Sequence, residues 1–566
     1  MSFQTPTSTV STQINGLGRL DGFQYADGVE QFCGIPYATL SKRWTRSLLN
    51  TSWENGYHDG TQLGNNCPRP LAPGIPDSSP LNPFIPVPPN PNFPRQPTTD
   101  EKTALVINVV IPEPLGPTAD TKKFPVLAFV HGGSLLYGSS SYGIYDGVNL
   151  VSHSLAIGLP IVMVSFNYRL GLGGFLASSK IADELKADGF SGNGNFGFTD
   201  QKVAMEWVQK YIAQFGGDPD NVTVVGQSAG AVSIGHHLAA NEPMRFKRAV
   251  CMSGLGSTLR ALSLEKHEFL FNATCRYFLI DAQATDALDR LRKIPEQILA
   301  DADHVIQGAP SGTGNPCLDG WFYAHDPLII TETPSWLKTF MIGDMHDEEV
   351  IFFTNLLKDT YATVRETILR HVQDEEFVNT ALEEYGITPD LSGYDLIVKV
   401  CVLGAEAVFQ ISNYKTALVN TRLQIKEHAL FKYHFDQRSH LKNILEGTAY
   451  HGFDILFLFM NLFNKFNDQE RTMARRFASS WIRFVHGQEP WGNGTEPTSW
   501  KVWGPDYQEK IETEAEDEPV RHYSRFKKLL ALGSSGIWDK YIMGVDDLLM
   551  KRGNAGKFDT CSDSGR

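Results

Sequence analysis

The segment Asn221–Gly230 reads NVTVVGQSAG and joins an apolar run to a serine that is flanked by small residues. The apolar run is typical of a buried β-strand. Ser228 lies in the pattern Gly-x-Ser-x-Gly, between Gly226 and Gly230. In a chain of 566 residues with 50 glycines the pattern arises by chance roughly 0.3 times, so its context must carry the argument.

The residues around Ser228 fit a sharp turn between a strand and a helix. The run VTVV supplies the strand, and AVSIGHHLAA, which follows Gly230, can supply the helix. A nucleophilic serine projects beyond its sheet, and small residues two positions away on either side relieve the crowding of such a turn. This context predicts the strand, elbow and helix of an α/β-hydrolase.

Other apolar runs indicate further strands of the same kind. Uninterrupted runs suit strands that are covered on both faces, as in a mainly parallel sheet. Within residues 199–219 apolar side chains recur at helical spacing, and the segment ends in Gly216, Gly217 and Pro219. A strand, a helix and a strand in this order predict a βαβ crossover and an α/β fold. The expected strands are 126–133, 161–171, 222–230, 248–254, 340–348 and 429–435.

A serine at neutral pH is a poor nucleophile, so it needs a histidine base and an acid that orients the base. In α/β-hydrolases these residues follow one another in the order serine, acid, histidine. Glu348, at the end of the run FMIGDMHDE, and His451, in the loop EGTAYHGFD, fit this order. We therefore predict a triad of Ser228, Glu348 and His451.

The attacked carbonyl becomes an oxyanion, which needs backbone N–H donors. The segment VHGGS at 130–134 follows an apolar run and offers Gly132 and Gly133, where no side chain blocks the substrate. Ala229, directly after the nucleophile, supplies another N–H group. These three residues form the predicted oxyanion hole.

With these residues in place, the sequence resembles the type-B carboxylesterases, which include cholinesterases and several fungal lipases. The resemblance begins near Val10, reaches at least Phe459 and continues more weakly to about residue 540. It rests on FCGIPYA (32–38), HGGS (131–134), YDGVNLV (145–151), NYRLGLGGFL (167–176), GNFGFTDQ (194–201), FGGDPDNVTVVGQSAG (215–230), GDMHDEEVIFF (343–353) and HGFDILFLF (451–459).

The resemblance implies one α/β-hydrolase domain over residues 1–566, with a large, mainly parallel sheet flanked by helices and insertions around the active site. It places the nucleophile, acid, base and oxyanion donors on the residues already singled out. The expected activity is the cleavage of a small-molecule carboxylic ester through an acyl-enzyme. The expected acid is Glu348 rather than the nearby Asp344, Asp347 or Glu349.

Two other functions stay open at this point. An alcohol that intercepts the acyl-enzyme would make the protein an acyltransferase or a lactone-forming enzyme. Some relatives have lost the nucleophile and act as binding modules, but all three triad positions are filled here.

We expect neither a cofactor nor a metal ion. The motif GNGNFG (192–197) matches the dinucleotide fingerprint but does not follow a strand directly. Adjacent residues of HDEE (346–349) would point to opposite faces of a strand, and no HExxH motif accompanies them.

Residues beside the predicted machinery suggest a partly apolar substrate pocket, although each could equally belong to the core. Gln227 stands where many relatives carry glutamate, and Ser134 stands where glycine or alanine is usual. Cholinesterase-like relatives carry a tryptophan for quaternary ammonium in the segment that matches 67–104, and this chain has none there, so choline esters are not expected. The pocket candidates are Ser134, Leu135, Leu136, Tyr137, Gln227 and Phe453.

Charge and hydropathy limit the partners. A net charge of -14 without a long basic run argues against nucleic acid. The apolar run 455–463 is far shorter than the ~20 residues that cross a bilayer, so no membrane span is expected. The sequence leaves the oligomeric state open.

The cysteines bear on the compartment. Secreted relatives close two short loops by disulfides, but here Ala104 replaces the partner of Cys67, and Arg290-Leu291-Arg292 replaces the motif that would pair with Cys275. The N-terminal residues also lack the apolar core of a secretory signal. We expect a cytoplasmic, disulfide-free enzyme. The alternative is a secreted enzyme numbered without its signal peptide, which the sequons at Asn50, Asn221, Asn272 and Asn493 would support.

The segment 67–104 is rich in proline, with twelve prolines from Pro68 to Pro97. This composition predicts a stiff, extended surface loop within the domain rather than a packed element. The loop is expected to supply some of the stiffness that the missing disulfide at Cys67 would have given.

Overall fold

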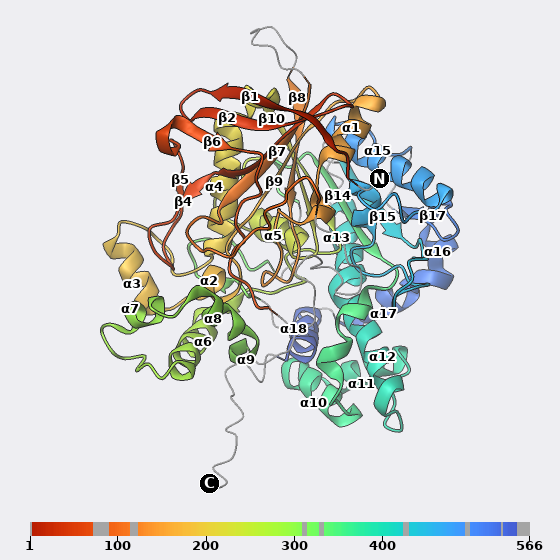
Figure 1. Cartoon of the computed structure of the whole chain (residues 1–566). Helices are drawn as coiled ribbons and strands as arrows, with labels where there is room; N and C mark the ends of the chain where they lie inside the picture. The colour runs from red at the N-terminus through yellow and green to blue at the C-terminus, as the bar shows by residue number, and fades with distance from the viewer. Residues whose placement is uncertain are drawn as a thin grey trace.

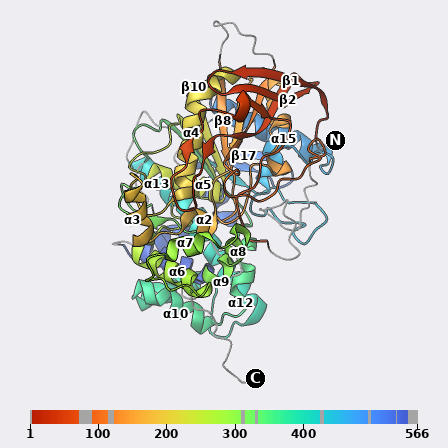
Figure 2. The ribbon, with the colours of Figure 1, turned by 60° about the vertical axis from the view of Figure 1, so that its left-hand side comes forward.

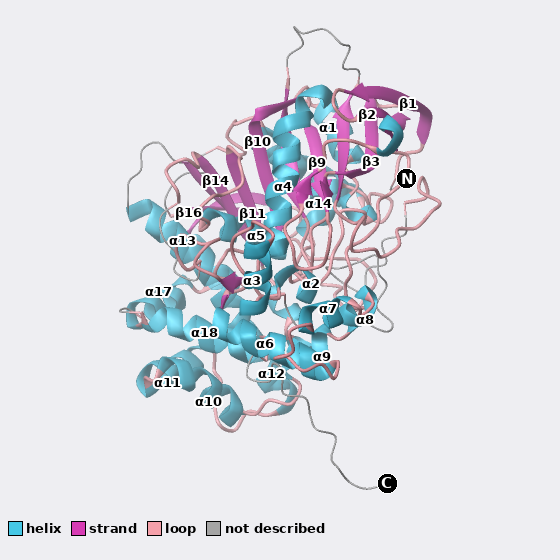
Figure 3. Ribbon diagram, turned by 90° about the vertical axis from the view of Figure 1, so that its left-hand side faces the viewer, coloured by secondary structure: helices cyan, strands magenta, loops and turns pink. Residues whose placement is uncertain are grey.

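A large mixed sheet forms the centre of the molecule (Figures 1 and 3). The computed structural model describes residues 3–71, 90–113, 123–307, 314–327, 333–422, 429–492, 498–533 and 536–551. Within them, the sheet has thirteen strands in the order β1-β2-β3-β7-β9-β8-β10-β11-β14-β15-β16-β17, with β6 paired to β2. Its strands are β1 (Pro6–Ile14), β2 (Gly18–Tyr25), β3 (Val29–Pro36), β6 (Tyr57–Asp59), β7 (Val106–Pro112), β8 (Phe124–Val130), β9 (Val162–Phe166), β10 (Gly217–Gln227), β11 (Arg248–Met252), β14 (Thr339–Met345), β15 (Ala429–Phe435), β16 (Ser499–Trp503) and β17 (Glu509–Thr513).

The middle of the sheet is parallel, and its two ends are antiparallel. Every pairing from β9 to β16 is parallel, whereas β1, β2, β3, β7 and β9 pair antiparallel, as do β16 and β17. The carboxyl ends of parallel strands meet at one edge of a sheet, where ligands bind in α/β folds. The segments that follow β8, β10 and β14 therefore come together at this edge.

Both faces of the parallel strands are covered, as their apolar composition predicts. Along β8, Val126, Ala128 and Val130 belong to one hydrophobic core, and Leu127 and Phe129 belong to the other. Helices α4 (Phe196–Tyr211) and α5 (Ala229–Leu238) contribute to the first core, and α1 (Val148–Ala156), α14 (Asp454–Phe459) and α15 (Asp468–Val485) to the second.

The remaining helices gather mostly beyond the carboxyl edge of the sheet, in the lower part of Figures 1 and 2. They come from chain segments far apart in sequence: α10 (Tyr361–Val372) and α12 (Gly393–Ala405) pack against α18 (Ile537–Leu549) (Figure 1). Two short sheets pair β4 (Ala38–Thr39) with β5 (Leu48–Leu49) and β12 (Leu262–Ser263) with β13 (Cys317–Leu318). The helices not yet named in the two cores are α2 (Gly171–Phe175), α3 (Ser179–Ala187), α6 (Leu264–Tyr277), α7 (Ala287–Arg292), α8 (Glu296–Asp301), α9 (Asp303–Gln307), α10 (Tyr361–Val372), α11 (Glu375–Glu384), α12 (Gly393–Ala405), α13 (Ile411–Arg422), α16 (Glu514–Arg521), α17 (Tyr523–Leu532) and α18 (Ile537–Leu549).

The α/β fold class and all six strands expected from the sequence are confirmed, with shifts at some ends. The helix expected within 199–219 begins earlier, at Phe196, and ends in a short 3-10 turn before Gly216, which has a φ of 75°. β10 begins at Gly217, before the expected Val222, because Gly217 pairs with Phe124 across a register shift.

Part of the proline-rich loop can be placed. Its residues 72–89 lie outside the described residues, whereas Phe93 is buried and Asn66 forms a β-bridge with Thr99. The described cysteines, all buried and free, are Cys33, Cys67, Cys251, Cys275, Cys317 and Cys401. No helix in the described part of the chain is long and apolar enough to span a membrane.

Candidate active site

Ser228 lies in a tight elbow between β10, which ends at Gln227, and α5, which begins at Ala229. Its backbone has φ 55° and ψ -126°, a combination that non-glycine residues rarely adopt. A Cβ atom on Gly226 would lie 2.4 Å from the carbonyl carbon of Gly230, and one on Gly230 would lie 2.0 Å from the carbonyl oxygen of Val130. The two glycines are therefore required, because backbone occupies the space of any side chain.

The segment after β8 passes directly beside Ser228. A Cβ atom on Gly132 would lie 2.9 Å from Cβ of Ser228, and Gly133 has a φ of 116°, which favours glycine. Ala229 is the first residue of α5, where backbone N–H groups have no partner within the helix. Among the described residues, the N–H groups of Gly133 and Ala229 donate to no other protein group, whereas the N–H of Gly132 faces the hydroxyl of Tyr145. Gly133 and Ala229 thus each offer an unbonded N–H group close to Ser228 in the chain or in space.

The loop that carries Gly132 and Gly133 is fixed at its start by two aromatic rings. The imidazole of His131 stacks on the ring of Tyr168, with 4.5 Å between the ring centroids. The hydroxyl of Tyr168 donates to the carbonyl oxygen of His131 over 2.8 Å. Burial lowers the pKa of His131 to about 4, so this residue is neutral at pH 7 and serves as a rigid support.

The next residues of the loop are held in an unfavourable backbone conformation. Ser134 and Leu135 have φ values of 58° and 56°. Such non-glycine residues cost about 1–3 kcal/mol each unless their surroundings hold them. The carbonyl oxygen of Leu135 accepts from the N–H of Gly171 over 2.8 Å, and that of Ser134 accepts from the N–H of Gly314 over 3.1 Å. These hydrogen bonds fix the loop.

Glu348 and His451 are in contact, although 103 positions separate them in the chain. Glu348 begins the turn after β14 and is fully buried, and His451 is 3% exposed. Nδ1 of His451 bonds to Oε2 of Glu348, and Oε1 of Glu348 accepts from the N–H of Met345 over 2.9 Å. This pairing leaves the proton on Nδ1 and turns Nε2 of the imidazole away from the acid.

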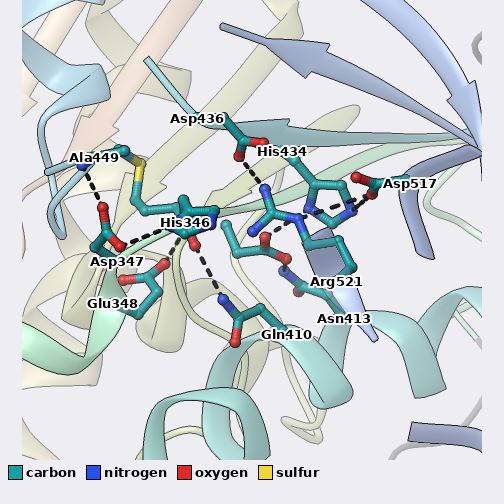
Figure 4. A network of polar contacts seen from close by, with 12 residues as sticks. His346, Asp347, Glu348, Gln410, Asn413, His434, Asp436, Ala449, Asp517 and Arg521 are labelled. Atoms are coloured by element: carbon teal, nitrogen blue, oxygen red, sulfur yellow. Dashed lines mark hydrogen bonds and ion pairs between the residues drawn. The ribbon is translucent and has the colours of Figure 1, made fainter. Parts of the chain in front are cut away.

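The other carboxylates near Glu348 have partners of their own (Figure 4). Oδ1 of Asp344 bonds to Nδ1 of His434 over 2.7 Å, and Oδ2 accepts from Nδ2 of Asn413 over 2.9 Å. Burial acts to raise the pKa of Asp344, but its interaction with His434, the charge of Arg521 and the hydrogen bond from Asn413 together lower it. Asp344 is therefore an ionised group that is committed to His434.

Asp347 ties the segment of the acid to the segment of the base. Its Oδ2 accepts from the N–H of Ala449 over 2.6 Å, its own N–H donates to the carbonyl oxygen of Ala449 over 3.0 Å, and its Oδ1 bonds to Nδ1 of His346 over 2.7 Å (Figure 4). Burial raises the pKa of the adjacent Glu349 to about 7. Of the four carboxylates considered from the sequence, Glu348 is the one bonded to His451.

Comparison with known proteins identifies the family of the chain. The family model described as "Carboxylesterase family" matches residues 6–529. The chain belongs to the carboxylesterase family. It is accordingly a carboxylic ester hydrolase.

Similar proteins include both lipases and esterases. The chain is 29% identical to Lipase 3 of Yarrowia lipolytica over 470 residues, which cover 82% of this chain and 86% of that protein. It is 27% identical to para-nitrobenzyl esterase of Bacillus subtilis over 512 residues, or 87% and 92% of the two chains. A solved structure of PNB esterase matches with a TM-score of 0.71 at 23% identity, covering 92% of this chain and 99% of that one, and thus shares its fold.

The residues expected to line a pocket divide into two groups in this carboxylesterase. Leu135 and Phe453 are fully buried members of the two hydrophobic cores, which is the alternative that the sequence left open, and Leu136 is fully buried as well. Ser134 and Tyr137 are half-buried. Tyr137 bonds through its hydroxyl to Nε2 of His304 on α9, over 2.5 Å.

Two buried residues near the predicted acid and base were not singled out from the sequence. Gln410 donates from Nε2 to the carbonyl oxygen of Met345 over 3.1 Å and so holds the segment that leads to Glu348. Asp454 is buried three residues after His451, where it accepts from the hydroxyl of Tyr433 over 3.0 Å. Asp454 is the carboxylate of the motif HGFD at 451–454, so the sequence could have indicated it. No motif in the sequence around Gln410 indicates that residue.

Proposed function

We propose that this carboxylesterase hydrolyses small carboxylic esters through an acyl-enzyme on Ser228. The observation that carries the proposal is the contact between Glu348 and His451, because Nε2 of this histidine lies 3.3 Å from Nε2 of Gln227, the residue before Ser228. An acid that orients a neutral histidine gives the imidazole the tautomer that a general base needs.

In each half of the proposed reaction His451 acts twice, first as a base and then as an acid. Nε2 of His451 takes the proton of Ser228 as Oγ attacks the ester carbonyl, and the N–H groups of Gly132, Gly133 and Ala229 stabilise the oxyanion. The imidazolium then gives its proton to the departing alcohol. Water, activated by the same histidine, releases the carboxylic acid and frees the serine.

The alternative of acyl transfer uses the same acyl-enzyme and differs only in the acceptor. Product analysis with a competing alcohol distinguishes the two reactions. We expect the free acid as the main product; an ester of the added alcohol as the main product would instead identify an acyltransferase.

The test of the proposed function is a panel of p-nitrophenyl esters of increasing acyl length, assayed with the wild type and with Ser228→Ala. The variant should lose at least about 10³-fold in kcat/KM and keep its thermal unfolding transition. Ser152→Ala, at a half-buried serine on α1, is the control and should retain wild-type rates. If Ser228→Ala keeps more than about a tenth of the wild-type rate, Ser228 is not the nucleophile.

A further inference from the structure

The ring of Phe409 packs against the imidazole of His451. The two ring centroids lie 5.3 Å apart, with 44° between the ring planes. Both residues are 3% exposed, so the contact is shielded from solvent. Phe409 therefore contacts the residue that is the base in the proposed function, on which this inference rests.

The hydrogen bond to Glu348 does not by itself fix the imidazole. It joins one atom of the ring, Nδ1 of His451, to Oε2 of Glu348. The imidazole can still turn about the line between these two atoms, and Nε2 lies off that line, so the turn would displace it. A ring packed beside the imidazole opposes the turn, because the turn would either overlap the neighbouring ring or open a void next to it.

A second phenylalanine connects Phe409 to the segment of the acid. Phe352 lies four positions after Glu348 and is 2% exposed. Its ring stacks on that of Phe409, with 6.2 Å between the centroids and 28° between the planes. The acid segment thus contacts Phe409, and Phe409 contacts the base, in addition to the direct hydrogen bond between acid and base.

Phe409 is carried by a π turn, Glu406–Gln410, that joins α12 to α13. The backbone hydrogen bond of this turn spans five residues. The hydroxyls of Ser412 and Thr258 donate to two carbonyl oxygens of the turn, over 3.1 Å and 2.9 Å. Such turns are rare within helices and are frequent at functional sites.

Both ends of the turn are fixed. At its start, Glu406 forms an ion pair with Arg525 on α17 and accepts from the hydroxyl of Tyr385 over 2.7 Å. At its end, Gln410 donates to the carbonyl oxygen of Met345 over 3.1 Å and so holds the strand end before the acid. The turn therefore presents the ring of Phe409 from a rigid support.

We propose that Phe409 is a positioning residue of the base: its ring, presented by the π turn, keeps the imidazole of His451 from turning about the hydrogen bond to Glu348. Phe409 bears no charge and exchanges no proton, so it acts only through the orientation of His451. A base that is out of position slows proton transfer in both halves of the reaction and leaves the binding of the ester unchanged.

The kinetic test compares wild type, Phe409→Leu and Phe377→Leu with p-nitrophenyl acetate and p-nitrophenyl butyrate. Phe377, on α11, is the matched control: it is also 3% exposed, belongs to the same core, and its ring lies 5.3 Å from that of Tyr541. Both variants should unfold at similarly lowered temperatures. Only Phe409→Leu should lose about ten- to thirtyfold in kcat, with KM within about threefold of wild type for both esters. A loss for one ester only, or a larger change in KM, would show that the ring contacts the substrate and would overturn the proposal.

A second measurement does not depend on turnover. In ¹H NMR spectra the proton on Nδ1 of His451 should give a far-downfield resonance, identified by its absence in His451→Gln. In Phe409→Leu this proton should exchange with water at least about tenfold faster than in wild type and in Phe377→Leu, because an unsupported imidazole breaks its hydrogen bond more often. An exchange rate equal to that of the control would show that Phe409 only fills the core.

Active-site titration with a fluorophosphonate separates the possible failures. Wild type and Phe409→Leu should each release one equivalent of fluoride per folded chain, and Ser228→Ala should release none. Release by Ser228→Ala would overturn the proposed function itself, whereas normal titration with an unchanged kcat of Phe409→Leu would overturn the role of Phe409 alone. If Phe409→Leu does not fold, Phe409→Met, which refills the site with a flexible side chain, takes its place and should show the same losses.

Discussion

Glu348 and Asp347 are neighbours in sequence with different partners, because one side chain faces His451 and the other faces Ala449. Glu348→Gln should lower kcat by about 10³–10⁴-fold, since the amide no longer holds the required tautomer of the base. Asp347→Asn should keep kcat within about tenfold and reduce the free energy of unfolding by about 1–3 kcal/mol, because it weakens a charged hydrogen bond. Steady-state kinetics and urea unfolding measure the two effects.

The reverse result would assign the acid differently. If Glu348→Gln turned over almost normally while Asp347→Asn was inactive, Asp347 would be the acid and the contact between Glu348 and His451 would be only structural.

Asp454 gives a prediction on pH and stability. Burial raises its pKa to about 7, above the ordinary value of 3.8. The native state therefore binds the proton more tightly than the unfolded state, so stability is greatest below about pH 4 and falls as the pH rises to about 7. Asp454→Asn should remove this loss and raise the free energy of unfolding at pH 8 relative to wild type, by up to about 4 kcal/mol.

Urea unfolding of wild type and Asp454→Asn at pH 5 and pH 8 tests this expectation. The advantage of the variant should be larger at pH 8 than at pH 5. An advantage that is equal at both pH values would show that Asp454 is ionised throughout the range.

At the scale of elements, the elbow depends on how closely β8, β10 and α5 approach. Gly230→Ala would place a Cβ atom 2.0 Å from the carbonyl oxygen of Val130, a backbone atom of the central sheet that cannot move aside. We expect a loss of at least about 3 kcal/mol, or failure to fold. Thermal unfolding measures the loss.

Gly173→Ala is the matched control within a helix. Gly173 lies in α2, and a Cβ atom there would meet nothing within 4 Å. This variant should unfold near the wild-type temperature. A Tm of Gly230→Ala within about 2 °C of that control would contradict the crowded elbow.

For the whole molecule, the described cysteines are buried and unpaired. We propose that the enzyme works in a reducing compartment, the cytoplasm, where the disulfides of secreted relatives would not form. Denatured, unreduced protein should therefore show all seven thiols reactive. Peptide mapping that located a native bridge at Cys67 or Cys275 would refute this and favour secretion.

The order of the strands brings the site together. β8, β10, β11, β14 and β15 are consecutive in the sheet and parallel. The segments that follow β8, β10 and β14 carry Gly132, Ser228 and Glu348, so their carboxyl ends deliver all three to the same edge. His451 reaches this edge through the pairing of Asp347 with Tyr450.

The sequence by itself determined the central strands and the elbow at Ser228. These follow from local rules: apolar runs mark buried strands, and a backbone turned at Ser228 tolerates only glycine at Gly226 and Gly230. The choice of Glu348 among four nearby carboxylates came from the resemblance to a family, because spacing alone did not separate them.

Only the tertiary structure decided which side chains meet across long sequence distances. Gln227 contacts His451, and Gln410 donates to the carbonyl oxygen of Met345, so each pair joins residues from different elements. The burial of Asp454 likewise depends on the elements packed around it. Likewise, whether Leu135 and Phe453 faced a pocket or the core depended on the packing of helices over both faces of the sheet. Local composition sets the periodicity of an element, but hydrogen bonds and burial depend on what the rest of the chain packs against it.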